Sequence, residues 1–351
     1  MLPHSKYFSG QVKKIVGFWG SWSPYSANDK FLCSDIDPQL FTHLVYTYLK
    51  VTESCNIDFA LDKPMIEEFI ALKLQNVKIK LLASVGGSPE FSKFLSQISA
   101  KADSREIFVS NTVKFLNECG LDGLDINWNL PTKNDKDNFV LLLKELRIAF
   151  NVPKFILTAT VNPTKQRGDD CYNAEAISKT VDFVNLLAFD LHGVWEKKTA
   201  ANAPLYAGSL DHPDLSVDAC VRYWSSKVDS STKLVLGVGT YGKLYQLTDS
   251  SQHGIGASIS AEVSETLSYP KILDNGWETN WSSSENCPYA FSGDKWVTFE
   301  NEESIEKKAN YAKEKKLGGI LIYSVEFDNF KGENGQEKFP LVKAARKVLC
   351  E

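Results

Sequence analysis

The chain has 351 residues, of which 43% are hydrophobic and 12% aromatic, so it can bury a large core as one big domain or two ordinary ones. Its formal net charge is -5 and its pI is near 5.7, with lysines and arginines scattered along the sequence. Because no basic stripe is visible, we do not expect a nucleic-acid binder. No run approaches the roughly 20 apolar residues that a spanning helix needs, so we expect no membrane insertion.

The N-terminus and the cysteines constrain the cellular compartment only in part. Residues 1–11 lack the apolar core of a signal peptide, which leaves two interpretations open: an intracellular protein or a mature secreted form. The seven cysteines show no metal-ligand spacing, and no glycine-rich nucleotide loop is present, so we expect neither a metal nor another cofactor. Cys33 and Cys55 follow the first two predicted strands and would meet at one rim, where they could form a disulfide. The sequon at Asn280 predicts N-glycosylation.

Short β-rich apolar runs alternate with helix-period segments along the whole chain. The predicted strands are 13–19, 43–49, 78–85, 121–127, 154–161, 182–189, 233–239 and 318–324. The predicted helices lie near 63–75, 89–119 in pieces, 133–149, 174–179, 216–228, 302–316 and 336–349, and Thr132 and Asn301 are suited to cap two of them. Eight strands with helical returns favour an α/β fold of the (β/α)8 TIM-barrel type over an open doubly wound sheet.

One connection is far longer than the others. Between the seventh and eighth strands, the chain from Gly242 to about Glu300 is rich in Ser, Thr, Gly and Tyr, and it is too long for a bare loop. We therefore expect a barrel made of residues 1–242 and 303–351, with residues 243–302 forming a small α+β insertion domain beside the barrel mouth.

Residues 121–131 carry an unusual stripe of polar side chains. In a strand, successive side chains face opposite sides, so Asp125, Asn127 and Asn129 share one face. The other face is apolar and includes Trp128, which we expect to pack under the helices. Polar groups on an inward face are costly unless they serve one another or a ligand, yet an amide has no proton to give. The stripe therefore indicates an active site from which the acids have been removed.

The carboxyl ends of the predicted strands, where barrel enzymes hold their reacting groups, collect a largely aromatic set. Flat rings with hydrogen-bonding neighbours are typical of sugar sites, although Phe18 and Tyr46 fit equally well as filling of the barrel interior. The set is Phe18, Trp22, Tyr46, Tyr48, Asp125, Asn127, Asn129, Asp190, His192, Tyr241, Lys243, Tyr323 and Glu326.

These motifs resemble those of the glycoside hydrolase family 18 chitinases and their chitinase-like relatives, over essentially the whole chain. The strongest match is DGLDINWNLP (122–131) against the family pattern DGxDxDWEYP. Further matches are KIKLLASVGG (78–87), DFVNLLAFDLHGVWEK (182–197), LVLGVGTYGK (234–243), WVTFENEESIEKK (296–308) and GGILIYSVEFDNFKG (318–332). The resemblance implies that 243–302 is a shortened form of the family's chitinase insertion domain.

The positions that differ from the family pattern indicate what the protein does. The resemblance places the catalytic Glu at Asn129, the Asp that orients the substrate acetamide at Asn127, and a supporting Tyr at Phe189, whereas Asp122 and Asp125 are kept. In the family mechanism the substrate's own acetamide attacks while the Glu protonates the leaving oxygen. Because general acid catalysis is usually worth about 10²–10⁴-fold, we expect the chain not to be an enzyme.

The resemblance also indicates which sugar contacts are kept and which are lost. Tyr323 stands for a Trp that floors the central subsite, Ser88 replaces another Trp, and Lys243 replaces an Arg. A cysteine pair of the family is absent, with Gly17 and Phe41 at its positions. The expected ligand-binding residues are Phe18, Trp22, Tyr48, Asp190, Tyr241, Lys243 and Tyr323, and we expect weak or altered sugar binding.

Three hypotheses remain. The first is a secreted, extracellular and monomeric chitinase-like lectin that binds chitooligosaccharide or a related glycan. The second is a growth or immune-modulating factor that acts through a protein receptor; the stretch GVGTYGKLYQLTD (237–249) is similar to one in the insect imaginal disc growth factors. The third is a weakly active chitinase that uses a displaced acid, Asp190 or Glu326.

Overall fold

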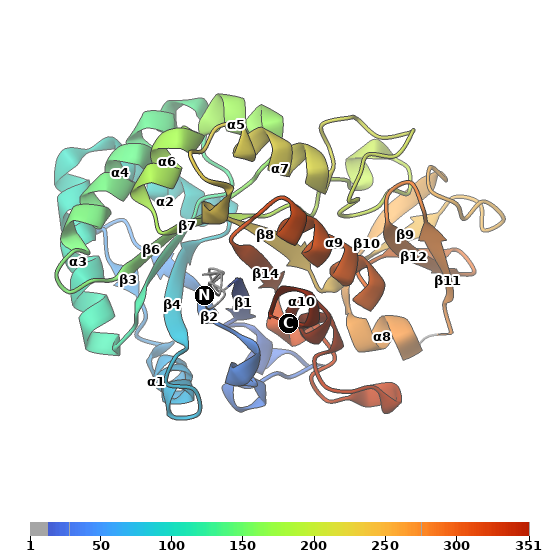
Figure 1. The fold of residues 1–351 in the computed structure, drawn as a ribbon, viewed down its shortest axis with the longest axis horizontal. Coiled ribbons are helices and arrows are strands. Elements are labelled where there is room, and N and C mark those ends of the chain that lie inside the picture. The colour runs from blue at the N-terminus through green and yellow to red at the C-terminus, as the bar shows by residue number, and fades with distance from the viewer. Residues whose placement is uncertain (1–12, 28, 275, 351) are drawn as a thin grey trace, which may run out of the picture.

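The structure is a computed structural model that describes residues 13–27, 29–274 and 276–350. Eight parallel strands pair side by side, and the first closes the ring by pairing with both the second and the last (Figure 1). They are β1 Lys14–Gly20, β2 His43–Val51, β4 Lys80–Gly86, β5 Gly123–Asn127, β6 Ile156–Val161, β7 Phe183–Leu186, β8 Leu234–Gly239 and β14 Gly319–Tyr323. The predicted (β/α)8 barrel is confirmed.

Helices lie around the outside of the barrel, most of them between successive strands, and α10 follows the last strand (Figure 1). They are α1 Lys63–Ala71, α2 Pro89–Ala100, α3 Ala102–Cys119, α4 Lys136–Ala149, α5 Lys165–Cys171, α6 Ala174–Thr180, α7 Val217–Ser225, α9 Glu302–Glu314 and α10 Pro340–Cys350. The predicted cap Asn301 accepts a hydrogen bond from the Ser304 amide at the start of α9. Within the described ranges, no helix is both long and apolar enough to cross a membrane.

The core has two parts, one inside the barrel and one between the strands and the helices. The interior is filled by Val16, Phe18, Val45, Leu82, Phe183, Val235 and Leu321. Outside the strands, Trp128 packs against Phe139 and donates to Ser92 Oγ at 2.8 Å, as the strand alternation predicts. A Cβ added at Gly17 would lie 2.6 Å from the Phe41 ring, so apolar packing fills the place of the family's cysteine pair.

The long connection between β8 and β14 forms a second sheet at one side of the barrel (Figure 1). Its elements are β9 Tyr241–Leu247, β10 Ile259–Ser268, α8 Tyr269–Asp274, β11 Glu278–Ser282, β12 Cys287–Ser292 and β13 Lys295–Thr298, and its strands pair antiparallel in the order β10-β9-β13-β12-β11. The sheet has its own small core around Tyr245 and Trp296. Asn280 of the sequon is half-buried on the edge strand β11. Of the predicted domain ranges, residues 1–12, 28, 275 and 351 lie outside the described residues.

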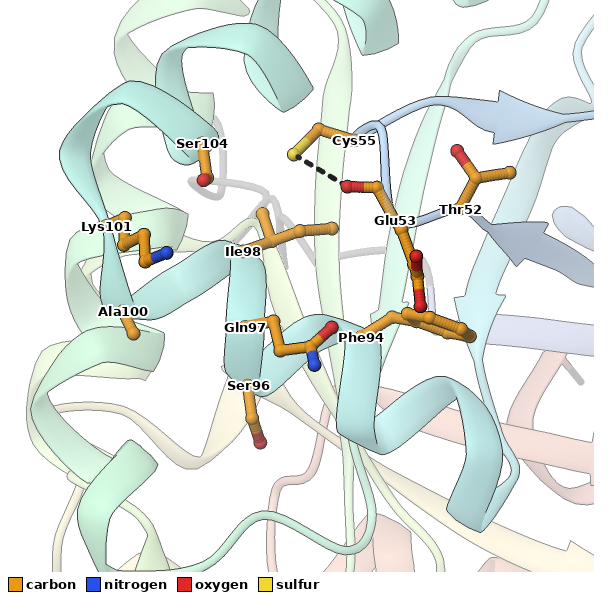
Figure 2. Close-up of a pocket in the computed structure, with 10 residues that line it drawn as sticks. All are labelled: Thr52, Glu53, Cys55, Phe94, Ser96, Gln97, Ile98, Ala100, Lys101 and Ser104. Carbon is orange, nitrogen blue, oxygen red and sulfur yellow. Dashed lines mark hydrogen bonds between the residues drawn. The ribbon is translucent and has the colours of Figure 1, made fainter.

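The predicted disulfide between Cys33 and Cys55 is wrong, because all seven cysteines carry free thiols. The two residues do follow neighbouring strands, but β2 runs on to Val51 and turns back through the short strand β3 (Ile57–Asp58). This turn carries Cys55 toward α2 and α3, and Asn111 of α3 donates to its carbonyl at 3.1 Å. Figure 2 shows the Cys55 thiol beside the Glu53 carbonyl, 4.0 Å away, at the edge of a surface hollow.

Candidate functional site

The polar stripe of β5 begins with a carboxyl group that holds the barrel interior together. The Asp125 side chain is fully buried and accepts hydrogen bonds from Ser84 Oγ at 2.8 Å, Thr158 Oγ1 at 2.6 Å and Thr160 Oγ1 at 2.8 Å. Ser84 of β4 and Thr158 of β6 lie in register with Asp125, and Thr160 lies two residues further along β6. Burial raises the pKa of Asp125 above its usual value, although these hydrogen bonds act in the opposite direction. Asp125 therefore serves as an interior acid that links strands.

The two amides of the stripe follow Asp125 toward the mouth of the barrel. Asn127 is 1% exposed, and its amide lies against the Tyr48 hydroxyl. Among the described residues, however, neither of its amide atoms has a partner that meets hydrogen-bond geometry. The same is true of the buried Oδ1 of Asn129. A buried polar atom left without a partner costs about 1–3 kcal/mol, so these amides are suited to a ligand that brings its own donors and acceptors. Sugar hydroxyl and acetamide groups do so.

An aromatic floor, made of Trp22, Tyr48, Phe189, Tyr241 and Tyr323, meets the amides where Tyr48 lies against Asn127. Tyr323 lies at its centre: the Phe189 ring stacks on it at 5.3 Å, and its hydroxyl is 2.7 Å from that of Tyr48. The ring of Trp22 continues the floor 5.8 Å from Tyr48, and Tyr241 closes it 6.4 Å from Tyr323. Burial, Tyr323 and the Asp125 carboxyl raise the pKa of Tyr48 well above its usual value, which keeps its hydroxyl neutral. The floor offers wide flat surfaces with neutral hydroxyls, which suits the C–H faces of sugar rings.

The loop after β4 makes room for this floor. A Cβ at Gly87 would lie 2.3 Å from the Tyr48 ring, and the backbone there has a positive φ of 80°, so glycine is needed on both counts. The next residue, Ser88, caps α2 by accepting from the Phe91 amide at 3.2 Å. Ser88 thus serves the helix and adds no aromatic wall to the site.

A second polar group lies at the rim of the floor. The Tyr241 hydroxyl donates to Asp190 Oδ1 at 2.6 Å, and Lys243 Nζ forms an ion pair with the same oxygen at 2.9 Å. Asp190 has a positive φ of 55°, and its side chain is 44% exposed, so part of the carboxylate is open to solvent. With two donors already bound, its carboxylate acts as an acceptor.

Glu326 follows β14 and lies beside Trp22. Its carboxyl group is buried and accepts hydrogen bonds from Ser324 Oγ at 2.7 Å and the Gly20 amide at 3.3 Å. Burial raises the pKa of Glu326 to about 7. These contacts hold the turn after β14 against the turn after β1, from which Trp22 projects.

Several predicted residues do not join the mouth. Asp122 lies at the amino-terminal end of β5, where it pairs with Lys73 at 2.9 Å. Phe18 is fully buried under Tyr323 and offers no surface to a ligand, and Tyr46 packs outside the strands against Phe69 of α1. His192 is buried and bonded to Glu196 at 2.7 Å, so it orders the loop after β7.

One candidate was missed by reasoning from strand ends alone. Trp195 lies in the loop after β7, five residues beyond Asp190, and 64% of its surface is exposed. Because its loop follows the carboxyl end of a barrel strand, Trp195 is a further candidate contact for a ligand at the mouth. Its place in the segment HGVWEK, directly after a strand end, was the available indication.

Known proteins of similar sequence include both named enzymes and a chitinase-like protein. The chain is 32% identical to chitotriosidase-1 of Mus musculus over 97% of its length and 79% of that protein. It is 33% identical to chitinase-3-like protein 2 of Homo sapiens, over 97% of the chain and 93% of the relative.

Solved structures of similar fold also include both a chitinase and a pseudo-chitinase. Human YKL-39, described as a pseudo-chitinase with retained chitooligosaccharide binding properties, superimposes with a TM-score of 0.91 at 32% identity, over 97% of this chain and 100% of that one. The Group IV chitinase of Ostrinia furnacalis has a TM-score of 0.91 at 31% identity, over 97% and 100%. The model of glycosyl hydrolases family 18 matches residues 14–328, and the chain therefore belongs to this family.

Proposed function

We propose that the protein is a non-catalytic member of this family that binds chitooligosaccharide or a related glycan in the barrel mouth. The observation that carries the proposal is the pair Asn127 and Asn129, whose buried amide atoms have no partner at hydrogen-bond geometry among the described residues. Asn127 also lies against Tyr48 of the aromatic floor. Amides at these positions can hold sugar hydroxyls, but they cannot protonate a leaving oxygen. The same two positions can therefore support sugar binding without supporting catalysis.

The remaining acids are poorly suited to replace the missing proton donor. Asp190 is bound by Tyr241 and Lys243, and Glu326 is bound by Ser324 and Gly20 beside Trp22. Phe189 has no hydroxyl to support an intermediate formed by the substrate's acetamide. Loss of general acid catalysis alone removes about 10²–10⁴-fold in rate, which supports a binding role.

The similarity to human YKL-39 supports the same role, since that protein is described as a pseudo-chitinase that retains chitooligosaccharide binding. Secretion to the extracellular space is also part of the proposal and rests on the family resemblance alone. The free thiols give it no support, because the one disulfide expected for an oxidising compartment is absent among the described cysteines.

The test is a titration of chitooligosaccharides monitored by tryptophan fluorescence, because Trp22 is 41% exposed at the end of the floor. We expect a saturable change, and Tyr323→Ala should weaken binding by about 1–3 kcal/mol, by analogy with the stacking of bases on aromatic rings. Tyr206→Ala is the control: this half-exposed ring contacts Tyr311 of α9, away from the floor, and its loss should leave binding unchanged.

Two outcomes would contradict the proposal. A flat trace at millimolar sugar would exclude glycan binding and favour a factor that acts through a protein receptor. Release of a fluorogenic chitobiose reporter above the blank would restore the hypothesis of a weak chitinase.

A further inference from the structure

A cavity of about 220 Å³ opens beside Trp22, at the end of the aromatic floor. Its lining comes from the turn after β1, from β10 and α8 of the insertion, and from the turn after β14. The residues used below are Trp22, Asp29, Thr266, Lys271, Glu326 and Phe327. The cavity therefore lies where the barrel and the insertion meet, next to an exposed aromatic face.

Of the charged side chains around this cavity, two form an ion pair with each other and the third, Glu326, does not. Asp29 and Lys271 form an ion pair at 2.8 Å, and Ser268 also donates to Asp29 at 3.3 Å, so these two side chains neutralise each other. Glu326 is 4% exposed, and within the described part of the chain its carboxyl group accepts hydrogen bonds from neutral donors: the Ser324 hydroxyl, the Gly20 amide and its own backbone amide. No basic side chain within the described residues lies within ion-pair distance of it.

A buried carboxyl group that lacks a cation is unfavourable when ionised, and its burial raises the pKa of Glu326 to about 7. A cation placed in the cavity would supply the missing charge. Thr266, the Asp29–Lys271 pair and Phe327 form the rest of the cavity wall used here. Trp22, at 41% exposure, presents a face on which a sugar ring can stack while a substituent points into the cavity.

We propose that this cavity binds the ammonium group of an unacetylated glucosamine unit, with the Glu326 carboxylate as its partner and the sugar ring on Trp22. This inference rests on the proposed glycan-binding function and adds to it: the preferred ligand is a partly deacetylated chitooligosaccharide. An acetamide at the same place carries no charge and leaves the carboxylate unpaired.

The experiment compares three tetramers by calorimetry at neutral pH: the fully acetylated form, and forms with a free amine only at the reducing or only at the non-reducing end. We expect one of the amine-bearing tetramers to bind about tenfold more tightly than the acetylated one, since charge-assisted hydrogen bonds are the stronger class. Glu326→Gln, which keeps the shape of the side chain, should abolish this preference, so that this variant binds the amine-bearing and the acetylated tetramers with equal affinity. Glu53→Gln, on the exposed turn between β2 and β3, is the matched control and should keep the preference.

The outcomes separate this inference from the proposed function. If the wild-type protein binds the acetylated tetramer and shows no preference for either amine, the inference is overturned and the proposed function stands. If Glu326→Gln keeps the preference, Glu326 is not the partner and the inference also fails. If no tetramer binds, both fail. Because the wild-type comparison needs no variant, the result does not depend on whether Glu326→Gln folds.

Discussion

At the scale of single residues, the decisive feature is a pair of amides, Asn127 at the end of β5 and Asn129 just beyond it, at positions where the family resemblance places acids. An amide has no proton to exchange. Phe189, which stacks on Tyr323 without a hydroxyl, and Ser88, which caps a helix, stand at two further positions where the resemblance implies other residues. The divergence from the family pattern that the resemblance implies is therefore not confined to the two amides.

This divergence predicts the result of restoring the acids. The double variant Asn127→Asp/Asn129→Glu should release a fluorogenic chitobiose reporter only weakly, because Phe189 and Ser88 still leave the sugar poorly supported. A second carboxyl group above Asp125, whose pKa burial already raises, also favours protonation of one of the two. Asn129→Glu alone serves as the reference, and turnover at the rate of ordinary chitinases from the double variant would contradict this account.

At the scale of elements, a buried ion pair joins the insertion to the barrel. Lys308 of α9 is fully buried; it binds Glu300, at the end of the insertion, and the carbonyl of Ala203 in the loop after β7. A second bond from Ser304 to Glu300 completes the group. The loop that carries Asp190 and Trp195 and the return from the insertion are thus held by one ammonium group.

Removing that group should destabilise the whole fold. Lys308→Met leaves Glu300 buried without a counter-charge, and we expect a loss of about 3–5 kcal/mol in the free energy of unfolding, measured with denaturant. The double variant Lys308→Met/Glu300→Gln should recover much of it. Lys307→Met, at the partly exposed neighbouring position, should change stability by less than about 0.5 kcal/mol. Equal effects of the two single variants would show that the buried pair has no special role.

The elements were largely predictable, because hydrophobic periodicity depends on local sequence. The eight barrel strands lie where the sequence places them, although β7 ends at Leu186 rather than 189, shortly before the left-handed turn at Asp190. Helix α5 was missed because Gly168 interrupts its short sequence pattern. The paths of the connecting turns were not predictable, which explains the wrong disulfide. The cavity beside Glu326 was not predictable for the same reason, because it forms where the turns after β1 and β14 meet the insertion.

At the scale of the whole molecule, several buried carboxyl groups set the pH dependence of stability. Burial raises the pKa of Glu326 from 4.5 to about 7 and that of Asp328 from 3.8 to about 7. Between the unfolded and folded values, the folded state binds more protons than the unfolded chain, so the free energy of unfolding falls as pH rises. His43, whose pKa is lowered to about 4, offsets part of this fall below pH 6.5.

We therefore expect the protein to lose roughly 1–3 kcal/mol of stability between pH 5 and pH 8, measured by denaturant unfolding at each pH. Glu326→Gln removes one of the two groups and should flatten the curve. Constant or rising stability over this range would show that the buried carboxyls are more solvated than their surroundings indicate.

The distribution of the thiols determines how the protein can be tagged. Five cysteines are buried, Cys119 is half-buried, and Cys350, at the end of α10, is exposed. A maleimide dye should therefore react first with Cys350, which lies on the outer helix α10 and away from the barrel mouth. Single-molecule or polarisation assays of glycan capture can then use the native chain without engineered attachment points.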